Sequence, residues 1–309
     1  MKVHVLHENP DWFTPIGAAL AGAGVPHDQW LLGDGLLDLD EPPPPGVFWS
    51  RMSASSHTRG HAQAKDQARA VLSWLEAAGR RVVNGRAALE LEVSKVAQLT
   101  ALRAAGFDVP RTLAVAGTTE LPAAARKLPV PFISKHNQGG KGLGVRLFSG
   151  HDEFDAYLES PEFVPPVDGI TLLQEYVRAA DPFITRAEIA GGTFIYAITA
   201  DTARGGFELC PADACAVDEP AGVPAPLFAL RQGFDHPVIA RYQDFARRHG
   251  IEIAGFEFIE TADGRLVTYD INTTTNYNAA IEAAAPRPAL PAVAAFLRRL
   301  LAEESGTGA

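Results

Sequence analysis

Short apolar runs that alternate with polar positions, as they do in β-strands, recur over the first 90 residues of the chain. They predict strands over three segments: residues 3–5, 46–49 and 81–83. Two stretches rich in alanine predict helices between these strands: residues 16–24 and 57–78. Because strands and helices alternate, we expect a small parallel α/β domain over residues 1–90.

From about residue 91 the pattern changes to paired strands and short helices. Ser94 is a predicted helix N-cap, and Gly106 is the predicted stop of that helix. Later apolar runs predict strands that pair as hairpins: residues 111–115, 131–148, 171–177, 183–189, 194–199 and a pair beyond 253. A further helix is predicted over residues 236–249. We therefore expect two α+β lobes, residues 91–180 and 181–309, and a frayed tail in the final EESGTGA.

Composition limits the classes of protein to consider. The 309 residues are 47% hydrophobic and 21% charged, which allows a large core divided among two or three lobes. The formal net charge of -10 argues against nucleic acid or an anionic membrane as a partner. Cys210 and Cys215 are too few for a disulfide framework, and the chain shows neither a signal peptide nor a membrane span. We expect a cytoplasmic protein.

A glycine-rich stretch, PFISKHNQGGKGLGVRLF, separates two apolar runs. It fails the Walker pattern because glycine follows its Gly-Lys pair, and it fails the dinucleotide pattern because a strand, not a helix, follows the glycines. The remaining interpretation is a hairpin that carries two lysines and three tip glycines: Lys135, Lys141, Gly140, Gly142 and Gly144. Backbone N–H groups and lysines that converge in this way suit a flap over phosphates. The alternative is an ordinary surface hairpin.

The segment GFEFIETADGRLVTYDINTTTNYN brings acidic residues together. An Asp-Gly pair between two alternating apolar runs predicts a hairpin with a two-residue turn, in which Glu257 faces Asp270. Asn272 then projects from the same face. Two carboxylates and an amide oxygen on directly opposed positions repel one another in an empty site. The same oxygen atoms are suitable ligands for Mg²⁺. An exposed polar face or a shifted register is the alternative.

A phosphate flap together with a magnesium site implies a nucleoside triphosphate. Six segments in order then carry a family resemblance: SKVAQLTALRAAGFDVPRT, FISKHNQGGKGLGV, LLQEYV, FITRAEIAGGTFIYAI, GFEFIE and YDIN. The chain resembles the ATP-grasp superfamily over residues 80–280, and more narrowly a RimK-type or glutathione-synthetase-like carboxylate-amine ligase. The resemblance implies a pre-ATP-grasp domain followed by the two α+β lobes of an ATP-grasp fold, with ATP and Mg²⁺ as cofactors.

The resemblance also implies roles for individual residues. At the nucleotide, Lys95 and Lys135 are expected to bind the phosphates, and the flap glycines are expected to close over them. The expected adenine hinge consists of Gln174, Glu175, Tyr176 and Val177, and Asp181 is the expected ribose contact. Those expected at magnesium are Glu257, Asp270 and Asn272. The expected catalytic residues are Arg186, Lys141 and Asn276. Read from its position alone, Lys95 is instead a solvated lysine that opposes the helix dipole.

Departures from the family pattern concern the substrates. His136 replaces the usual proline, and the usual Pro-Gly segment after Asn272 is replaced by TTTNYN, in which Asn276 is the expected substrate contact. An arginine common in the family is absent at Ala200 and Asp201, so Arg204 is the candidate to replace it. In the first domain WSRMSASSHTRGH follows a strand, where open α/β sheets bind ligands. It offers four candidates for substrate binding: Arg51, Ser55, Ser56 and Arg59. The alternative is that one of the serines caps the following helix and that the arginines are solvated.

The implied chemistry is carboxylate activation. ATP phosphorylates a carboxylate to an acyl phosphate, an amine displaces phosphate, and an amide forms with release of ADP. We expect small-molecule carboxylate and amine partners, an amino acid or a peptide among them, and a homodimer or homotetramer. The alternatives are a kinase with a non-carboxylate acceptor and a nucleotide-binding regulatory module without turnover.

Overall fold

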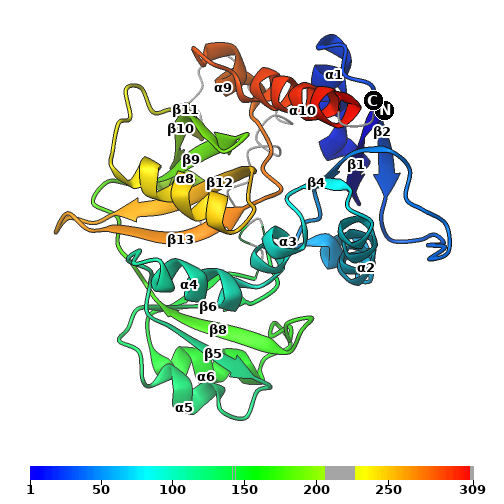
Figure 1. The fold of residues 1–309 in the computed structure, drawn as a ribbon. Coiled ribbons are helices and arrows are strands. Elements are labelled where there is room, and N and C mark those ends of the chain that lie inside the picture. The colour runs from blue at the N-terminus through cyan, green and yellow to red at the C-terminus, as the bar shows by residue number, and fades with distance from the viewer. Residues whose placement is uncertain (141, 143, 206–226, 307–309) are drawn as a thin grey trace, which may run out of the picture.

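Three sheets and the helices around them make up the computed structural model of the chain (Figure 1). It describes residues 1–140, 142, 144–205 and 227–306, with residues 204 and 205 described only as backbone. Two predicted site residues are affected. Lys141 lies outside the described residues, and Arg204 is described only as backbone in α7 (Thr202–Gly205).

The N-terminal sheet is parallel throughout and has the order β2-β1-β3-β4. Its strands are β1 (Lys2–His7), β2 (His27–Leu31), β3 (Gly46–Ser50) and β4 (Arg81–Val83). The helices beside it are α1 (Pro10–Gly22) and α2 (Ala64–Ala77). The predicted parallel α/β arrangement is therefore confirmed, although β2 was not predicted because its residues HDQWL carry no clear alternation.

Two predicted helix boundaries in this domain are wrong. Helix α1 begins six residues earlier than expected, because the Oδ1 of Asn9 accepts hydrogen bonds from the backbone of Asp11 and Trp12. The expected single helix over 57–78 is divided into a 3₁₀ turn, Ser56–Arg59, and α2. Gly60 separates the two with a φ of 82°, a left-handed conformation that ends the first helix.

The central sheet is antiparallel, with the order β5-β8-β6-β7. Its strands are β5 (Thr112–Ala116), β6 (Phe132–His136), β7 (Arg146–Phe148) and β8 (Ile170–Glu175). Two short helices cover one face: α5 (Leu121–Ala125) and α6 (His151–Glu159). Phe132, Phe148 and Phe154 pack as a fully buried aromatic cluster between sheet and helices, which fixes the base of the glycine flap between β6 and β7.

The C-terminal sheet is also antiparallel, with the order β11-β10-β9-β12-β13. Its strands are β9 (Phe183–Ala190), β10 (Thr193–Asp201), β11 (Phe228–Leu230), β12 (Ile253–Glu260) and β13 (Leu266–Asn272). The helices of this part are α8 (Val238–Arg248), α9 (Ala279–Ala284) and α10 (Ala289–Gly306). Two further helices precede the central sheet in sequence: α3 (Arg86–Val93) and α4 (Lys95–Ala104).

Two helices pack across the proposed domain limits. Leu99 and Leu102 of α4 share a core cluster with Tyr242 and Phe256 of the C-terminal region. Helix α10 lies beside α1 and close to both chain ends (Figure 1), and its Leu297 belongs to a cluster that includes the N-terminal sheet. The division into 1–90, 91–180 and 181–309 therefore stays a proposal. The predicted frayed tail is wrong up to Gly306, because α10 continues through it.

The acidic hairpin has a different turn from the predicted one. Five residues, 261–265, connect β12 and β13, and Glu260 faces Leu266. This loop shifts the register by one position relative to a two-residue turn, and a β-bulge at Tyr269 shifts it back. Glu257 consequently faces Asp270, as predicted, although the two-residue turn on which that prediction depended is wrong. No helix among the described residues is both long and apolar enough to cross a membrane.

Candidate functional site

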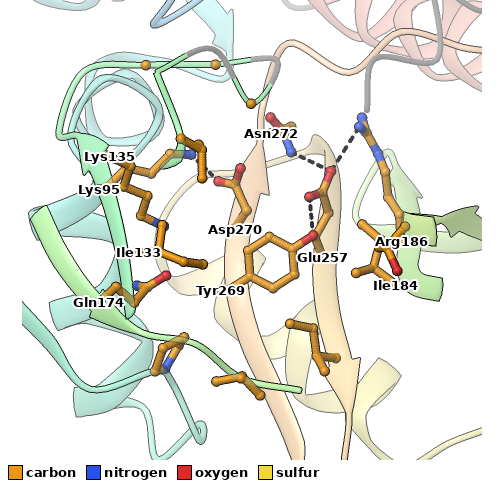
Figure 2. Close-up of a pocket in the computed structure, with 18 of the residues that line it drawn as sticks. Lys95, Ile133, Lys135, Gln174, Ile184, Arg186, Glu257, Tyr269, Asp270 and Asn272 are labelled. Atoms are coloured by element: carbon orange, nitrogen blue, oxygen red, sulfur yellow. Dashed lines mark hydrogen bonds and ion pairs between the residues drawn. The ribbon is translucent and has the colours of Figure 1, made fainter. Parts of the chain in front are cut away.

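A cavity of about 780 Å³ lies between the central and C-terminal sheets and reaches the N-terminal domain (Figure 2). Its lining includes most of the predicted site residues from all three regions of the chain: Ser55, Lys95, Lys135, Gly140, Gly142, Gln174, Glu175, Tyr176, Val177, Asp181, Arg186, Glu257, Asp270, Asn272 and Asn276. Residues separated by more than 200 positions in sequence therefore meet around one space.

The two carboxylates of the hairpin and Asn272 project into this cavity from β12 and β13 (Figure 2). The Nδ2 of Asn272 donates to Oε1 of Glu257 at 3.1 Å, which leaves its amide oxygen as a further ligand. The hydroxyl of Tyr269, the bulged residue, donates to Oε2 of Glu257 at 2.8 Å. Burial raises the pKa of Glu257, the Arg186 guanidinium opposes that rise, and the nearby Asp270 adds to it. Clustered oxygen donors under mutual repulsion suit a divalent cation.

The described residues contain no group of three or more His, Cys, Asp or Glu side chains placed to hold a metal ion. The predicted magnesium site consists of two carboxylates and one amide, so it does not depend on such a group. Its oxygen-only donor set fits Mg²⁺, which takes one or two carboxylates and leaves its other positions to water and substrate phosphates. The residues present therefore fit the group that the fold implies.

Lys95 is the first residue of α4 and is only 7% exposed, so the interpretation as a solvated lysine is wrong. Its Nζ forms an ion pair with Oδ1 of Asp270. Burial acts to lower the pKa of Lys95, but Asp270 and Glu92 outweigh it and the net shift is upward. The cation that opposes the helix dipole is thus held by the acidic hairpin.

Lys135 on β6 lies beside Lys95 at the same side of the cavity (Figure 2). No carboxylate among the described residues forms an ion pair with it. Burial, and secondly the charge of Lys95, lowers the pKa of Lys135 to about 8. An ammonium group with a depressed pKa at the wall of a cavity is suited to receive an anion, which restores its protonated form.

The flap backbone has the conformation that the glycines were expected to allow. Gly142 and Gly144 have φ values of 73° and 74°, in the left-handed region that favours glycine. At Gly140 a Cβ would lie 3.3 Å from the Cβ of Ser55, so the base of the flap packs against the N-terminal domain. Gly140 and Gly142 line the cavity.

The predicted adenine hinge spans the end of β8 and the two residues after it, and it lines the cavity. Gln174 is fixed by donating from Nε2 to Oγ1 of Thr112 at 2.8 Å, and Glu175 accepts from the backbone N of Arg111 at 2.8 Å. Two isoleucines, Ile133 and Ile184, supply apolar walls to the same space (Figure 2). Apolar side chains with a few polar groups beside them are the usual lining of a small-molecule site.

Arg186 lies on β9, and its contacts include Glu188, Glu257 and Thr275. Its Nε donates to Oε1 of Glu188 at 2.7 Å and its Nη1 to Oε1 of Glu257 at 3.3 Å, while its Nη2 donates to Oγ1 of Thr275. Glu188 is 1% exposed and also accepts from Thr275 at 3.0 Å. Glu188 and Thr275 were not predicted, because their role arises only when β9 meets the TTTNYN segment.

A missing side chain makes room for this arginine. On adjacent strands Arg186 faces Glu257 and Glu188 faces Gly255. A Cβ at position 255 would lie 2.9 Å from Cζ of Arg186 and closer still to its Nε. Glycine therefore leaves the space over β12 that the guanidinium occupies.

The substrate candidates of the N-terminal domain differ from one another. Arg59 donates to both oxygens of Glu8 and, at 3.0 Å, to Oγ of Ser55. Arg51 is 3% exposed and donates from Nη2 to the carbonyl of Thr275 at 2.8 Å. Neither Ser55 nor Ser56 caps the following helix through its side chain, and Ser56 is fully buried. The alternative of a capping serine and solvated arginines is therefore wrong.

Glu92 is a further cavity residue that the sequence did not reveal. It is buried on α3, and its Oε2 accepts from both the backbone N and the hydroxyl of Thr273 at 2.7 and 2.9 Å. Burial raises the pKa of Glu92, with the positive charge of Lys95 acting in the opposite direction. Its only sequence signal is a glutamate within an apolar helical stretch.

No model of a known protein family and no curated protein matches this sequence. Solved structures do. The RimK domain ATP-grasp protein of Sphaerobacter thermophilus matches with a TM-score of 0.68 and 18% identity, covering 96% of this chain and 99% of that one. D-cycloserine synthetase DcsG matches with a TM-score of 0.65 and 17% identity, covering 97% and 99%.

A third structure is that of the ATP-grasp ligase PsnB complexed with a minimal precursor, Mg and ADP. It matches with a TM-score of 0.64 and 16% identity, covering 96% of this chain and 96% of that one. Coverage of nearly the whole length on both sides includes the N-terminal domain. The chain has the ATP-grasp fold, which confirms the fold predicted from the sequence.

Proposed function

Because the chain has the fold of the ATP-grasp ligases, we propose that it is an ATP- and Mg²⁺-dependent ligase that joins a carboxylate to an amine. The observation that carries the proposal is the convergence of three cations with the acidic hairpin around one cavity: Lys95, Lys135 and Arg186. Phosphoryl transfer requires mainly positioning and charge neutralisation, and these groups supply both.

In this proposal ATP lies with its base in the slot beside Gln174, Glu175, Tyr176 and Val177, and its ribose near Asp181. Lys95 and Lys135 bind phosphate oxygens, and the glycine flap closes over them. Glu257, Asp270 and Asn272 would hold Mg²⁺. When bound, Mg²⁺ supplies neutralisation of the phosphate charge that the lysines alone do not provide.

Arg186 is placed to bind the transferred phosphoryl group. Its planar guanidinium is held by Glu188 and Thr275 on one side, and Arg186 also lines the cavity. A substrate carboxylate attacks the γ-phosphoryl group and forms an acyl phosphate with release of ADP. An amine then attacks the acyl carbon, the C–O bond to phosphate breaks, and an amide remains. No nucleophile from the protein is needed.

The substrates proposed are an amino acid or a small peptide on one or both sides. The names of structurally similar proteins support this substrate class. DcsG is a D-cycloserine synthetase, and PsnB has been solved with the precursor peptide PsnA2 and AMPPNP. We propose that the carboxylate and amine enter from the side of the N-terminal domain, where Ser53, Ser55 and Asn276 line the cavity.

Trapping with hydroxylamine tests the proposal. The protein is incubated with ATP, Mg²⁺, hydroxylamine and a panel of amino acids and dipeptides, and hydroxamate and ADP are measured together. Equal amounts of both are expected, and Asp270→Asn should lower both in parallel. A stable phosphorylated product without hydroxamate would favour a kinase. ATP binding without ADP release across the whole panel would favour a regulatory module.

A further inference from the structure

Arg51 is a buried cation for which the described residues provide no carboxylate partner. It is 3% exposed, and its Nε is buried without a hydrogen-bond partner. Its contacts are the carbonyl of Thr275, the Oδ1 of Asn276 at 3.0 Å and the ring of Trp49, whose centroid lies 5.1 Å from Cζ. A buried charge that is not neutralised is costly, so its retention calls for a ligand.

The other charged groups nearby do not neutralise Arg51. Arg59 is itself cationic and is paired with Glu8. Glu92 forms no ion pair with Arg51, and its Oε2 accepts hydrogen bonds from Thr273, although its charge acts to raise the pKa of Arg51. The nearby hydroxyl of Tyr277 is buried without a partner, and burial raises its pKa. Burial lowers the pKa of Arg51 to about 10, which leaves it charged at neutral pH.

Asn276 connects this charge to the cavity. Arg51 lies behind the cavity wall, and Asn276 lines the cavity directly. Because Oδ1 of Asn276 accepts from Nη2 of Arg51, the amide is oriented with its Nδ2 donors available to a ligand. A donor that is backed by an uncompensated guanidinium selects an anion over a neutral group.

We propose that Arg51 and Asn276 form a subsite for a free carboxylate that is not consumed in the reaction, so that one substrate is an amino acid or a peptide with a free C-terminus. The inference rests on the proposed ligase function and adds the class of one substrate. Nδ2 of Asn276 donates to this carboxylate, and the charge of Arg51 stabilises it. Arg59, whose charge Glu8 already neutralises, has no part in the subsite.

Kinetics with matched probes test the subsite. Each of the twenty L-amino acids is offered as the free acid and as its carboxamide, singly and in pairs, and ADP release is measured. For a productive pair, amidation of the unreacted carboxylate should raise KM at least tenfold. Arg51→Gln should raise KM for the free acid about 10- to 100-fold, leave KM for the carboxamide unchanged, and leave KM for ATP within twofold.

A control variant and the contrary outcome accompany this test. Arg69→Gln removes an arginine of the same domain that pairs with Asp66 and Glu90 on the surface, and it should behave as wild type. If Arg51→Gln raised KM equally for acid and carboxamide, or raised KM for ATP to the same extent, the subsite would be refuted. Arg51→Lys keeps the charge and should recover part of the preference for the acid.

Unfolding experiments test the subsite even if no pair releases ADP, an outcome that would refute the ligase function alone. Without ligand, Arg51→Gln should be at least as stable in urea as wild type, because it removes a buried charge without a partner. Disodium malonate as a probe dicarboxylate should raise the Tm of wild type more than that of Arg51→Gln. Equal malonate shifts, or a clear loss of stability in the variant, would count against an anion subsite.

Discussion

Of the four cations on which the proposals rest, two have carboxylate partners among the described residues and two do not. Arg186 is paired with Glu188 and Glu257, and Lys95 is paired with Asp270. Lys135 and Arg51 have no carboxylate partner among the described residues. The neutralised pair lies against the acidic hairpin of the C-terminal sheet, whereas the other two belong to the central sheet and to the N-terminal domain.

The difference separates cations that already have a carboxylate partner in the empty protein from cations that only a ligand would neutralise. A buried ion pair leaves each member dependent on the other, so removal of one exposes the cost of burying its partner. A buried cation without a partner costs free energy in the empty protein and recovers it when an anion binds. Removal of a paired cation should therefore lower the stability of the protein. Removal of an unpaired cation should instead lower ligand affinity without lowering stability.

Arg186→Gln is expected to have the largest effect. It leaves Glu188 buried without its cation, and we expect the free energy of unfolding to fall by about 3 to 5 kcal/mol. Turnover should fall about 100-fold or more, because the donor to the phosphoryl group is lost. Urea unfolding and ADP release on the same preparations measure the two effects.

The double variant Arg186→Gln, Glu188→Gln separates these effects. Because both charges are then absent, stability should return toward that of wild type while turnover stays low. Additive losses in the double variant would mean that the two side chains do not depend on each other. The contrast with Arg51 would then lose its basis.

Much of the fold could be predicted because it depends on local pattern. Parallel α/β alternation and the antiparallel hairpins follow from the spacing of apolar residues and turn residues, and these were confirmed. Strand β2 was missed because it lies at the edge of its sheet, where half-exposed positions carry little alternation. The helix over 57–78 was predicted as continuous because its alanines conceal the break at Gly60.

The site could be predicted only where one hairpin or one motif contains it. The opposition of Glu257 and Asp270 was predicted correctly from a wrong turn, because a five-residue loop and a one-residue bulge compensate. Glu92 could not be predicted, since it bonds to Thr273, 181 positions away in sequence. The same holds for the contact of Arg51 with Asn276. Such contacts depend on how three regions pack, and no local period encodes that.

Gly255→Ala tests whether the position of Arg186 depends on the empty space over β12. The added methyl group would overlap the guanidinium, so the arginine must move away from Glu188. We expect a loss of about 1 to 3 kcal/mol in unfolding free energy and a larger fall in kcat than in ATP affinity. Gly22→Ala is the matched control, because no atom outside its own helix lies within 4 Å of the new Cβ. Equal behaviour of the two variants would contradict the role of Gly255.

The pH dependence of nucleotide binding tests whether Lys135, which has no carboxylate partner among the described residues, binds the phosphates. Its pKa in the folded protein is lowered to about 8, against about 10.4 in an unfolded chain. Between these values the unfolded state binds more protons, so stability without ligand should rise with pH across this window. Affinity for a triphosphate should fall in the same window, because the ammonium group is lost.

Calorimetry with AMPPNP and Mg²⁺ at about pH 7 and about pH 9 should show binding weaker by about tenfold at the higher value. Lys135→Arg stays charged throughout, so its affinity should change little between the two conditions. Lys135→Met should bind weakly at both. If Lys135→Arg kept the pH dependence of wild type, another group would be responsible, and Lys135 would not be the proposed phosphate ligand. Lys95, whose pKa the acidic hairpin raises, cannot supply that other group in this range.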